Sequence, residues 1–279
     1  MQSSTGTFRG AAGAELFQRL WLPDEPPRAV VLLIHGIGEH GGRFAGVAAA
    51  LTAHGLAVAA YDQRGHGRSP GQRGHINRWA DYREDLRACH ALVRRHFPAL
   101  PLFLYGVSMG SLVALDYVLR EPGDVRGVMV SGVPLQPTGA AKPWLVALVK
   151  WLSRPWPTLA FQLRLEHAAL SRETEVVRAY QADPLVHGLI TARWGTEMLA
   201  TIAWVKAHAA GLRTPLLMVH GEADRINSAA GAREFWEAVQ LRDKERYLDP
   251  GGYHEPHNDL NRAAVLQKIA HWMLRHLQP

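Results

Sequence analysis

Residues 101–115, PLFLYGVSMGSLVAL, decide the fold that we predict for this chain. They begin with an apolar run at 102–105, typical of a buried strand, and end in small and apolar residues at helical spacing. Between the two lies GVSMG at 106–110, a G-x-S-x-G pattern in a strand–turn–helix context. Side chains two positions before and after the serine would clash in so tight a turn, so both positions are glycine. The pattern predicts that Ser108 is held in a strained conformation at a helix N-terminus, with its hydroxyl exposed as a nucleophile.

A glycine- and serine-rich turn without chemistry is the alternative interpretation, but the strand before and the helix after the turn favour catalysis. A serine hydroxyl is a weak nucleophile that needs a base and an orienting acid. We expect these partners in the order serine, carboxylate, histidine, the last two each following a late strand.

The composition is that of one large globular α/β chain with room for an insertion. The chain has 279 residues, 47% of them hydrophobic and 20% charged, which excludes a disordered protein. Its single cysteine, Cys89, excludes a disulfide framework and a cysteine-rich metal site, and fits a reducing cytoplasm. The first residues do not resemble a secretory signal, and no window has the length of a charge-free transmembrane helix. The net charge of +6 is scattered without a nucleic-acid-binding motif, so we expect no nucleic-acid partner.

Strand and helix patterns alternate along most of the chain. Residues 7–22 contain two short strand-like runs, and the alternation in the second, at 15–21, predicts a half-exposed antiparallel strand. The patterns then predict strands at 29–34, 56–61, 102–105, 125–130, 215–221 and 244–248, and helices at 44–54, 79–97, 111–119, 229–240 and 259–277. Such alternation implies a mostly parallel central sheet with helices on both faces, an α/β fold.

The alternation stops between residues 137 and 210, where no clear strand is visible. PWLVALVKWL at 143–152 is strongly apolar and contains Trp144 and Trp151. We interpret this stretch as a helical cap inserted between two strands. The predicted organisation is a first core part at 1–136, a cap at 137–210 and a second core part at 211–279.

Two carboxylates and two histidines compete for the acid and base positions. HGEADRI at 220–226 follows a predicted strand, and its G-x-x-D spacing favours Asp224 over Glu222 as the acid. GGYHEPH at 251–257 follows the last strand and contains both His254 and His257, which chain order does not separate. An oxyanion hole needs two backbone N–H donors, one from Met109 and the other expected from Ile37 in the glycine-rich loop after 35–36. We interpret DQRGHGRS at 62–69 as a structural lock.

Five motifs together resemble the monoacylglycerol lipase group of α/β-hydrolases, which includes lysophospholipase-like enzymes: HGIGEHGGRF, DQRGHGRSPGQRG, GVSMGS, EADR and GGYHEPHND. TEV at 174–176, Tyr180 and DPL at 183–185 extend the resemblance into the predicted cap. The resemblance implies an α/β-hydrolase fold with a helical cap and no metal or organic cofactor. It also implies the site residues: a triad of Ser108, Asp224 and His254, oxyanion donors at Ile37 and Met109, and a glycerol pocket of Glu39, Arg43, Tyr180 and His257.

The function implied is hydrolysis of monoacylglycerols, single-chain lipid esters, with transient membrane or micelle contact through the cap and a cytoplasmic, membrane-peripheral location. A lysophospholipase or a short-chain esterase is the alternative activity, and a non-enzymatic ligand-binding module is the alternative class. Epoxide hydrolases and dehalogenases use aspartate where this chain has Ser108. Ile37 is larger than the residue in animal members, which narrows the expected acyl entrance. The sequence does not indicate an oligomeric state.

Overall fold

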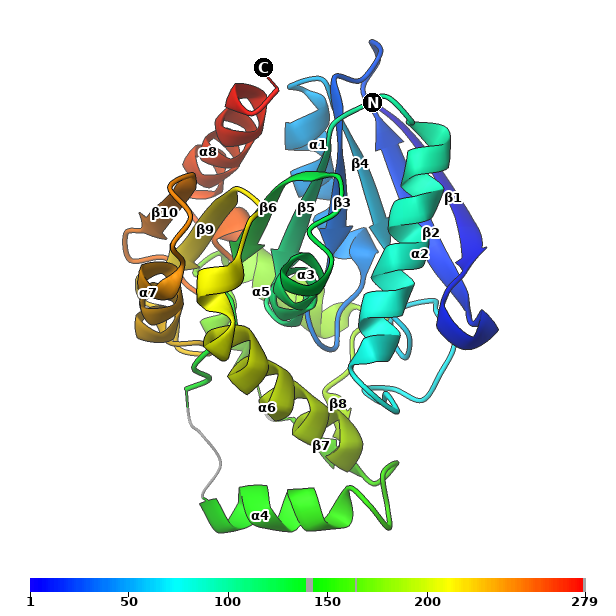
Figure 1. Cartoon of the computed structure of the whole chain (residues 1–279), viewed down its shortest axis with the longest axis vertical. Coiled ribbons are helices and arrows are strands. Elements are labelled where there is room, and N and C mark those ends of the chain that lie inside the picture. The colour runs from blue at the N-terminus through cyan, green and yellow to red at the C-terminus, as the bar shows by residue number, and fades with distance from the viewer. Residues whose placement is uncertain (139–142, 164, 278–279) are drawn as a thin grey trace.

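The computed structural model describes residues 1–138, 143–163 and 165–277. Its centre is an eight-stranded sheet in the order β1-β2-β4-β3-β5-β6-β9-β10 (Figure 1). Only the β1–β2 and β2–β4 pairs are antiparallel; the other five pairs are parallel. The strands are β1 (Gln2–Arg9), β2 (Glu15–Leu22), β3 (Ala29–Ile34), β4 (Leu56–Tyr61), β5 (Leu102–Val107), β6 (Val125–Ser131), β9 (Leu216–Gly221) and β10 (Lys244–Asp249). The predicted mostly parallel sheet is thereby confirmed.

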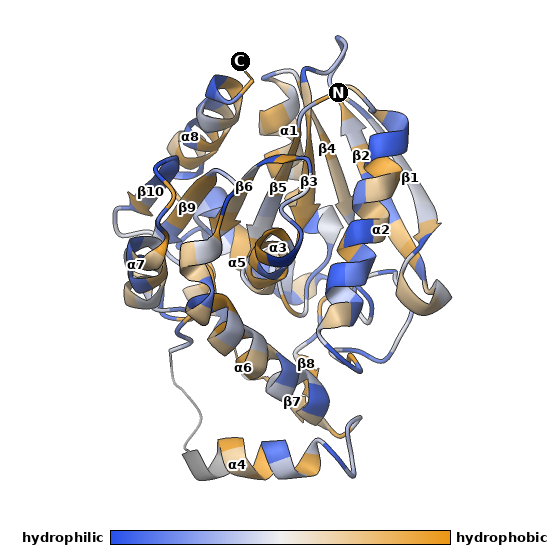
Figure 2. Ribbon diagram, in the orientation of Figure 1, coloured by the Kyte–Doolittle hydropathy of each residue, from blue (hydrophilic) through white to orange (hydrophobic). Residues whose placement is uncertain are grey.

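Helices cover both faces because the buried strands are apolar on both sides. In β3, Val30 and Leu32 pack into the core under α2 (Ala80–His96), α3 (Met109–Arg120) and α7 (Ala229–Ala238). Val31 and Leu33 point the opposite way, toward α1 (Ala45–Thr52) and α8 (Arg262–Arg275). Figure 2 shows the central strands in hydrophobic colours and the covering α2 with hydrophilic and hydrophobic residues alternating along it. Strand periodicity thus builds two cores on one sheet.

The chain between β6 and β9 forms a separate layer. It contains α4 (Pro143–Leu152), α5 (Thr174–Ala182) and α6 (Ala192–Ala207), with α6 lying between α4 and the core in Figure 1. It also contains two short strands, β7 (Ala160–Gln162) and β8 (Leu189–Thr191), which pair antiparallel. The sequence predicted no strand here; runs of three residues are too short to show a period of two. The division into core and cap at residues 137 and 210 stays a prediction.

Two details at the chain's ends differ from the sequence prediction. The first strand begins at Gln2, earlier than the predicted run. The last helix begins at Arg262 and not at the predicted residue 259, so Leu260 lies before it and is 57% exposed. The remaining short elements are 3₁₀ turns at η1 (Ala11–Gly13), η2 (Gly41–Phe44), η3 (His167–Ala169), η4 (Ala209–Gly211) and η5 (Pro256–Asn258). Among the described residues, no helix has the length and apolar character to cross a membrane.

Candidate active site

Ser108 lies in the tight turn between β5 and α3. Its φ of 50° and ψ of −122° lie in a region that non-glycine residues rarely adopt. A Cβ on Gly106 would lie 2.4 Å from the carbonyl oxygen of Gly110, and one on Gly110 would lie 2.0 Å from that of Ile34. Ser111 supports the turn from behind, since its hydroxyl donates to the carbonyl of Gly106 at 2.8 Å. Glycine is therefore required on both sides of the serine.

The loops after β9 and β10 bring a carboxylate to a histidine. Nδ1 of His254 lies 2.8 Å from Oδ2 of Asp224. The other carboxylate oxygen of Asp224 accepts the backbone N–H of Ile226 at 2.8 Å and of Asn227 at 3.0 Å. Glu222, the competing carboxylate, is exposed and instead accepts the backbone N–H of Gly251. The geometry pairs Asp224, and not Glu222, with His254.

Asp224 and His254 each shift the pKa of the other so that the charged form is favoured. Burial acts to raise the pKa of Asp224, but the charge of His254 and hydrogen bonds from His220 and His254 hold that pKa well below its usual range. Burial acts to lower the pKa of His254, but the charge and hydrogen bond of Asp224 outweigh it, so the pKa of His254 is raised. Asp224 therefore stays ionised and stabilises a protonated His254.

The glycine-rich loop after β3 approaches the serine closely. A Cβ on Gly36 would lie 3.1 Å from Cβ of Ser108, so only glycine fits. The loop is held by Gln63, whose side-chain amide donates to the carbonyl of His35 at 2.7 Å. Ile37 from this loop and Met109 from α3 line the same cavity as Ser108. Both residues predicted to donate to the oxyanion thus border the cavity at Ser108; their role as donors stays a prediction.

Asp62, in the DQRGHGRS motif, is buried and fastens this region. It accepts the backbone N–H groups of Gly41 and Arg68, both at 2.9 Å, and the side chain of Arg19 at 2.6 Å. These contacts tie the glycine-rich loop to β2 and to the loop after β4, as expected of a structural lock.

Glu39 and Glu255 line a pocket with Ser108, and Arg43 joins the two carboxylates. Arg43 donates to both oxygens of Glu255, at 2.9 Å each, and also to Glu39. Its guanidinium lies 4.6 Å from the ring centre of Tyr180. Sequence reasoning missed Glu255, although its position next to His254 in GGYHEPH was a usable signal. Burial raises the pKa of Glu39 to about 7, whereas for Glu255 burial is outweighed by Arg43, which lowers that pKa to about 2.

His257 does not lie with this cluster at the pocket surface. It is 1% exposed, and its ring stacks on Phe44 with centroids 5.1 Å apart. Neither ring nitrogen has a hydrogen-bond partner among the described residues. Burial lowers the pKa of His257 to about 4. Of the four predicted head-group residues, Glu39 and Tyr180 line the small pocket beside Ser108, whereas Arg43 and His257 do not line it.

Two hollows meet at Ser108. The smaller, about 30 Å³, is lined by Glu39, Tyr180, His254 and Glu255 together with apolar residues. The larger, about 420 Å³, is bordered mostly by apolar side chains. Those of Leu163, Leu165, Trp194, Met198 and Ile226 are among them. Its volume is in the range of small-molecule sites. Glu166 and Arg225 also line it and form an ion pair at 3.2 Å.

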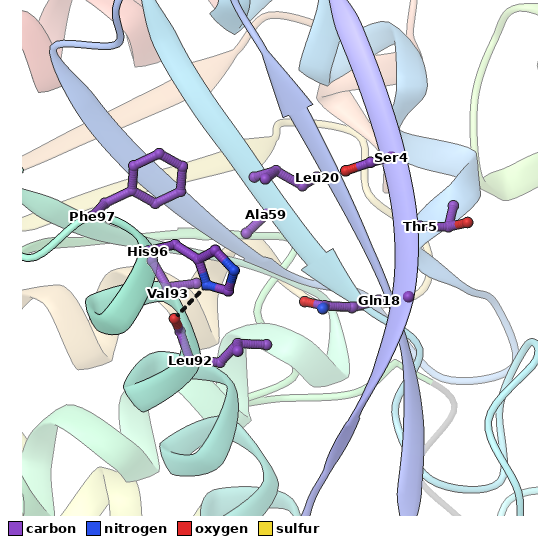
Figure 3. Close-up of a pocket in the computed structure, with 10 residues that line it drawn as sticks. Ser4, Thr5, Gln18, Leu20, Ala59, Leu92, Val93, His96 and Phe97 are labelled. Carbon is purple, nitrogen blue, oxygen red and sulfur yellow. Dashed lines mark hydrogen bonds between the residues drawn. The ribbon is translucent and has the colours of Figure 1, made fainter.

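A third hollow, of about 100 Å³, lies between the β1–β2 hairpin and the end of α2 (Figure 3). Ser4 borders it with its hydroxyl, the side chain of Thr5 points away from it, and His96 lies on its other side. Nδ1 of His96 is bonded to the carbonyl of Leu92 at 2.9 Å, so this ring nitrogen is not free to act as a base. None of the predicted site residues lines this hollow.

Within the described ranges, no three His, Cys, Asp or Glu side chains are grouped to hold a metal ion. The reactive groups that the structure brings together are the hydroxyl of Ser108 and the hydrogen-bonded pair of His254 and Asp224.

Comparisons with known proteins identify the family of this chain. The sequence profile of the family "Serine aminopeptidase, S33" matches residues 25–261. The monoacylglycerol lipase of Mycolicibacterium smegmatis is 37% identical over 275 residues, 98% of each chain. Human monoglyceride lipase is 31% identical over 94% of this chain and 88% of its own. The crystal structure of Paleococcus ferrophilus monoacylglycerol lipase superposes with a TM-score of 0.85 at 31% identity, covering 94% of this chain and 99% of that one. The chain therefore belongs to the monoacylglycerol lipase family, whose members are serine hydrolases with the α/β-hydrolase fold.

Proposed function

We propose that this protein hydrolyses monoacylglycerols to glycerol and a free fatty acid. The observation that carries the proposal is the junction of two unequal hollows at Ser108: a small one of about 30 Å³, where the polar groups of Glu39, Tyr180 and Glu255 lie among apolar residues, and a larger, mostly apolar one of about 420 Å³. An ester with one acyl chain and a small polyol head matches this division. The names of the relatives support the same substrate.

The proposed mechanism is acyl transfer through a covalent intermediate. Ser108 attacks the ester carbonyl while His254 accepts its proton, and Asp224 stabilises the imidazolium. The backbone N–H groups of Ile37 and Met109 stabilise the developing oxyanion. His254 then protonates the departing glycerol, and a water molecule, deprotonated by the same histidine, releases the fatty acid.

The two hollows hold the two halves of the substrate. In this proposal Glu39 and Tyr180 contact the glycerol hydroxyls, with Arg43 and His257 behind them as supports. The acyl chain lies against Leu163, Leu165 and Met198 in the larger hollow. Each buried methylene contributes about 0.8 kcal/mol, so binding strengthens with chain length until the hollow is full.

The layer between β6 and β9 acts as a cap that touches lipid surfaces. Trp151 is 64% exposed and Trp156 55%, and their rings meet edge to face with centroids 6.3 Å apart. Leu148, which lies on α4 with Trp151, is also exposed, and Lys150 lies on the same helix. The side chain of Trp144, which belongs to the same apolar stretch at 143–152, lies outside the described residues. Removing each large side chain from water contributes roughly 1.5–3 kcal/mol, enough for a transient, peripheral contact.

The test is a series of 1-monoacylglycerols of increasing chain length, assayed beside matching triacylglycerols and lysophosphatidylcholines. We expect kcat/KM to rise with chain length and to be far higher for monoacylglycerols than for triacylglycerols, since further acyl chains would have to enter the small hollow of about 30 Å³. Equal rates on triacylglycerols would contradict the proposal. Preference for the lysophospholipid would identify the alternative activity, lysophospholipase.

A further inference from the structure

Glu255 engages Arg43 along a whole edge of its guanidinium. Two parallel hydrogen bonds of 2.9 Å join Nη1 and Nη2 of Arg43 to the two oxygens of Glu255. The carboxylate is held in place by the side-chain amide of Asn258, which donates to Oε2 at 2.8 Å. The backbone N–H of Glu255 donates to the carbonyl of Leu170 at 2.8 Å, and the residue is only 3% exposed. Glu255 is therefore a fixed, buried partner of Arg43.

Because Arg43 is paired in this way, the described part of the chain places no unpaired lysine or arginine at the small hollow beside Ser108. Nη1 of Arg43 also contacts Glu39, and Tyr180 covers a face of the guanidinium. The pocket is bordered by the carboxylates of Glu39 and Glu255, and no lysine or arginine of the described part of the chain lines it. One guanidinium compensates one of two carboxylates, so the cluster carries a net negative charge when both are ionised.

Resting on the proposed function, we propose that Glu255 is a specificity-determining residue that restricts this enzyme to esters of uncharged polyols and rejects anionic head groups, carboxylate or phosphate. A leaving group in the small hollow meets Glu39 and Glu255, both of which line it and are buried, at 4% and 3% exposure. Like charges repel strongly there because the local dielectric constant is low. Arg43, which would otherwise attract an anion, is neutralised by Glu255. Specificity of this kind depends on a repulsive element as much as on an attractive one.

Two substrates of nearly the same shape distinguish the effect of head-group charge from the effect of head-group size. In 3-lauroylglycerate a carboxylate replaces the free CH₂OH of 1-lauroylglycerol, so the acyl chain and the reacting ester are unchanged. The measured quantity is the ratio of kcat/KM for the glycerate to that for the glycerol ester, at pH 8, where Glu39, with its pKa of about 7, is ionised. We expect a ratio of about one-tenth or less in the wild type.

Glu255→Gln keeps the shape and removes the charge, and it should raise this ratio by about tenfold. Glu255→Asp keeps the charge and should leave the ratio near the wild-type value. Glu222→Gln is the matched control, because it makes the same change at an exposed residue outside the pocket. An unchanged ratio in Glu255→Gln, or equal cleavage of both esters by the wild type, would overturn the inference.

The wild type provides a second test that needs no folded variant. The charged and titratable groups around Glu39 are Arg43, Glu255, Tyr180 and His254, with His257 behind Glu255. Protonation of Glu39 between pH 8 and 6 removes one negative charge, so the ratio should rise as the pH falls. Titration of His254 affects both esters equally and cancels in the ratio. A ratio independent of pH would count against the inference.

Failure of the proposed function would give a different result: nitrophenyl laurate would be cleaved but 1-lauroylglycerol would not.

Discussion

Oδ2 of Asp224 lies 2.8 Å from Nδ1 of His254, although 30 positions separate the two residues in the chain. The contact forms because β9 and β10 are parallel neighbours, so the loops after them leave the same edge of the sheet. Nδ1 is occupied by the carboxylate, which leaves Nε2 of His254 as the nitrogen available to accept a proton from Ser108.

This contact predicts where activity is lost on acidification. His254 must be neutral to act as a base, and its pKa is raised above the ordinary 6.5. The kcat/KM of the wild type for an activated ester should therefore fall as the pH drops, with a midpoint above 6.5. Asp224→Asn should move that midpoint to lower pH and reduce kcat by about 10⁴-fold. An unshifted midpoint in this variant would contradict the assignment of the acid, and Glu222→Gln is the control.

Ser108→Ala should abolish turnover without unfolding the protein. Removal of a triad nucleophile lowers kcat by about six decades. A fluorophosphonate probe should label Ser108 in the wild type and nothing in the variant, as read by mass spectrometry of peptides. Ser111 is the informative neighbour, because its single hydroxyl hydrogen has two backbone carbonyl acceptors, Gly106 at 2.8 Å and Ser131 at 2.9 Å. Labelling of Ser111 would show that the wrong serine has been assigned.

The two histidines of the 251–257 loop should behave differently. His254→Ala should remove kcat on every ester, since the serine proton then has no acceptor. His257→Ala should leave kcat for a nitrophenyl ester nearly unchanged and raise KM for glyceryl esters, because His257 supports the head-group pocket from behind. Steady-state kinetics on both ester types distinguish them. The reverse pattern would exchange the two roles.

His257 should also make folding stability dependent on pH. Its pKa is lowered to about 4, below the ordinary 6.5, so the unfolded chain binds its proton more tightly. Its contribution is fully present above pH 6.5 and is lost as the pH falls from 6.5 toward 4, at about 1.4 kcal/mol per pH unit. In His257→Phe, which keeps the stack on Phe44, the free energy of unfolding should fall less steeply over this window. Urea titrations at several pH values measure the difference, and equal slopes would contradict it.

Substitutions on the exposed face of the cap should weaken lipid binding. Trp151→Ser and Trp156→Ser should each lower partitioning onto phospholipid vesicles by about tenfold, while leaving turnover of a water-soluble nitrophenyl ester unchanged. Leu260→Ser is the control, since Leu260 is similarly exposed, at 57%, but lies outside the cap. Vesicle sedimentation gives the partition coefficients. Equal binding by all three variants would mean that the cap does not contact lipid.

The local features of this protein were predictable from the chain alone. GVSMG predicts a strand–turn–helix with glycine on both sides of Ser108, because the steric demand of that turn involves only neighbouring residues. The apolar runs predict the buried strands, because the hydrophobic pattern of a strand is also a property of neighbouring residues. The position of Asp224 after a late strand predicts the acid, since the end of a parallel strand is readable from its hydrophobic pattern.

What depends on distant residues came only from the tertiary structure. Chain order left His254 and His257 as alternatives for the base, and the resemblance to a family separated them; the structure then places only His254 against Asp224. Arg43 and Glu255 lie 212 positions apart, and nothing in their local sequence indicates that they pair. The short β7–β8 pair is likewise invisible in the sequence. Pairing across such distances is set by which loops the folded sheet brings to one edge, and the periodicity of a single segment carries no information about that arrangement.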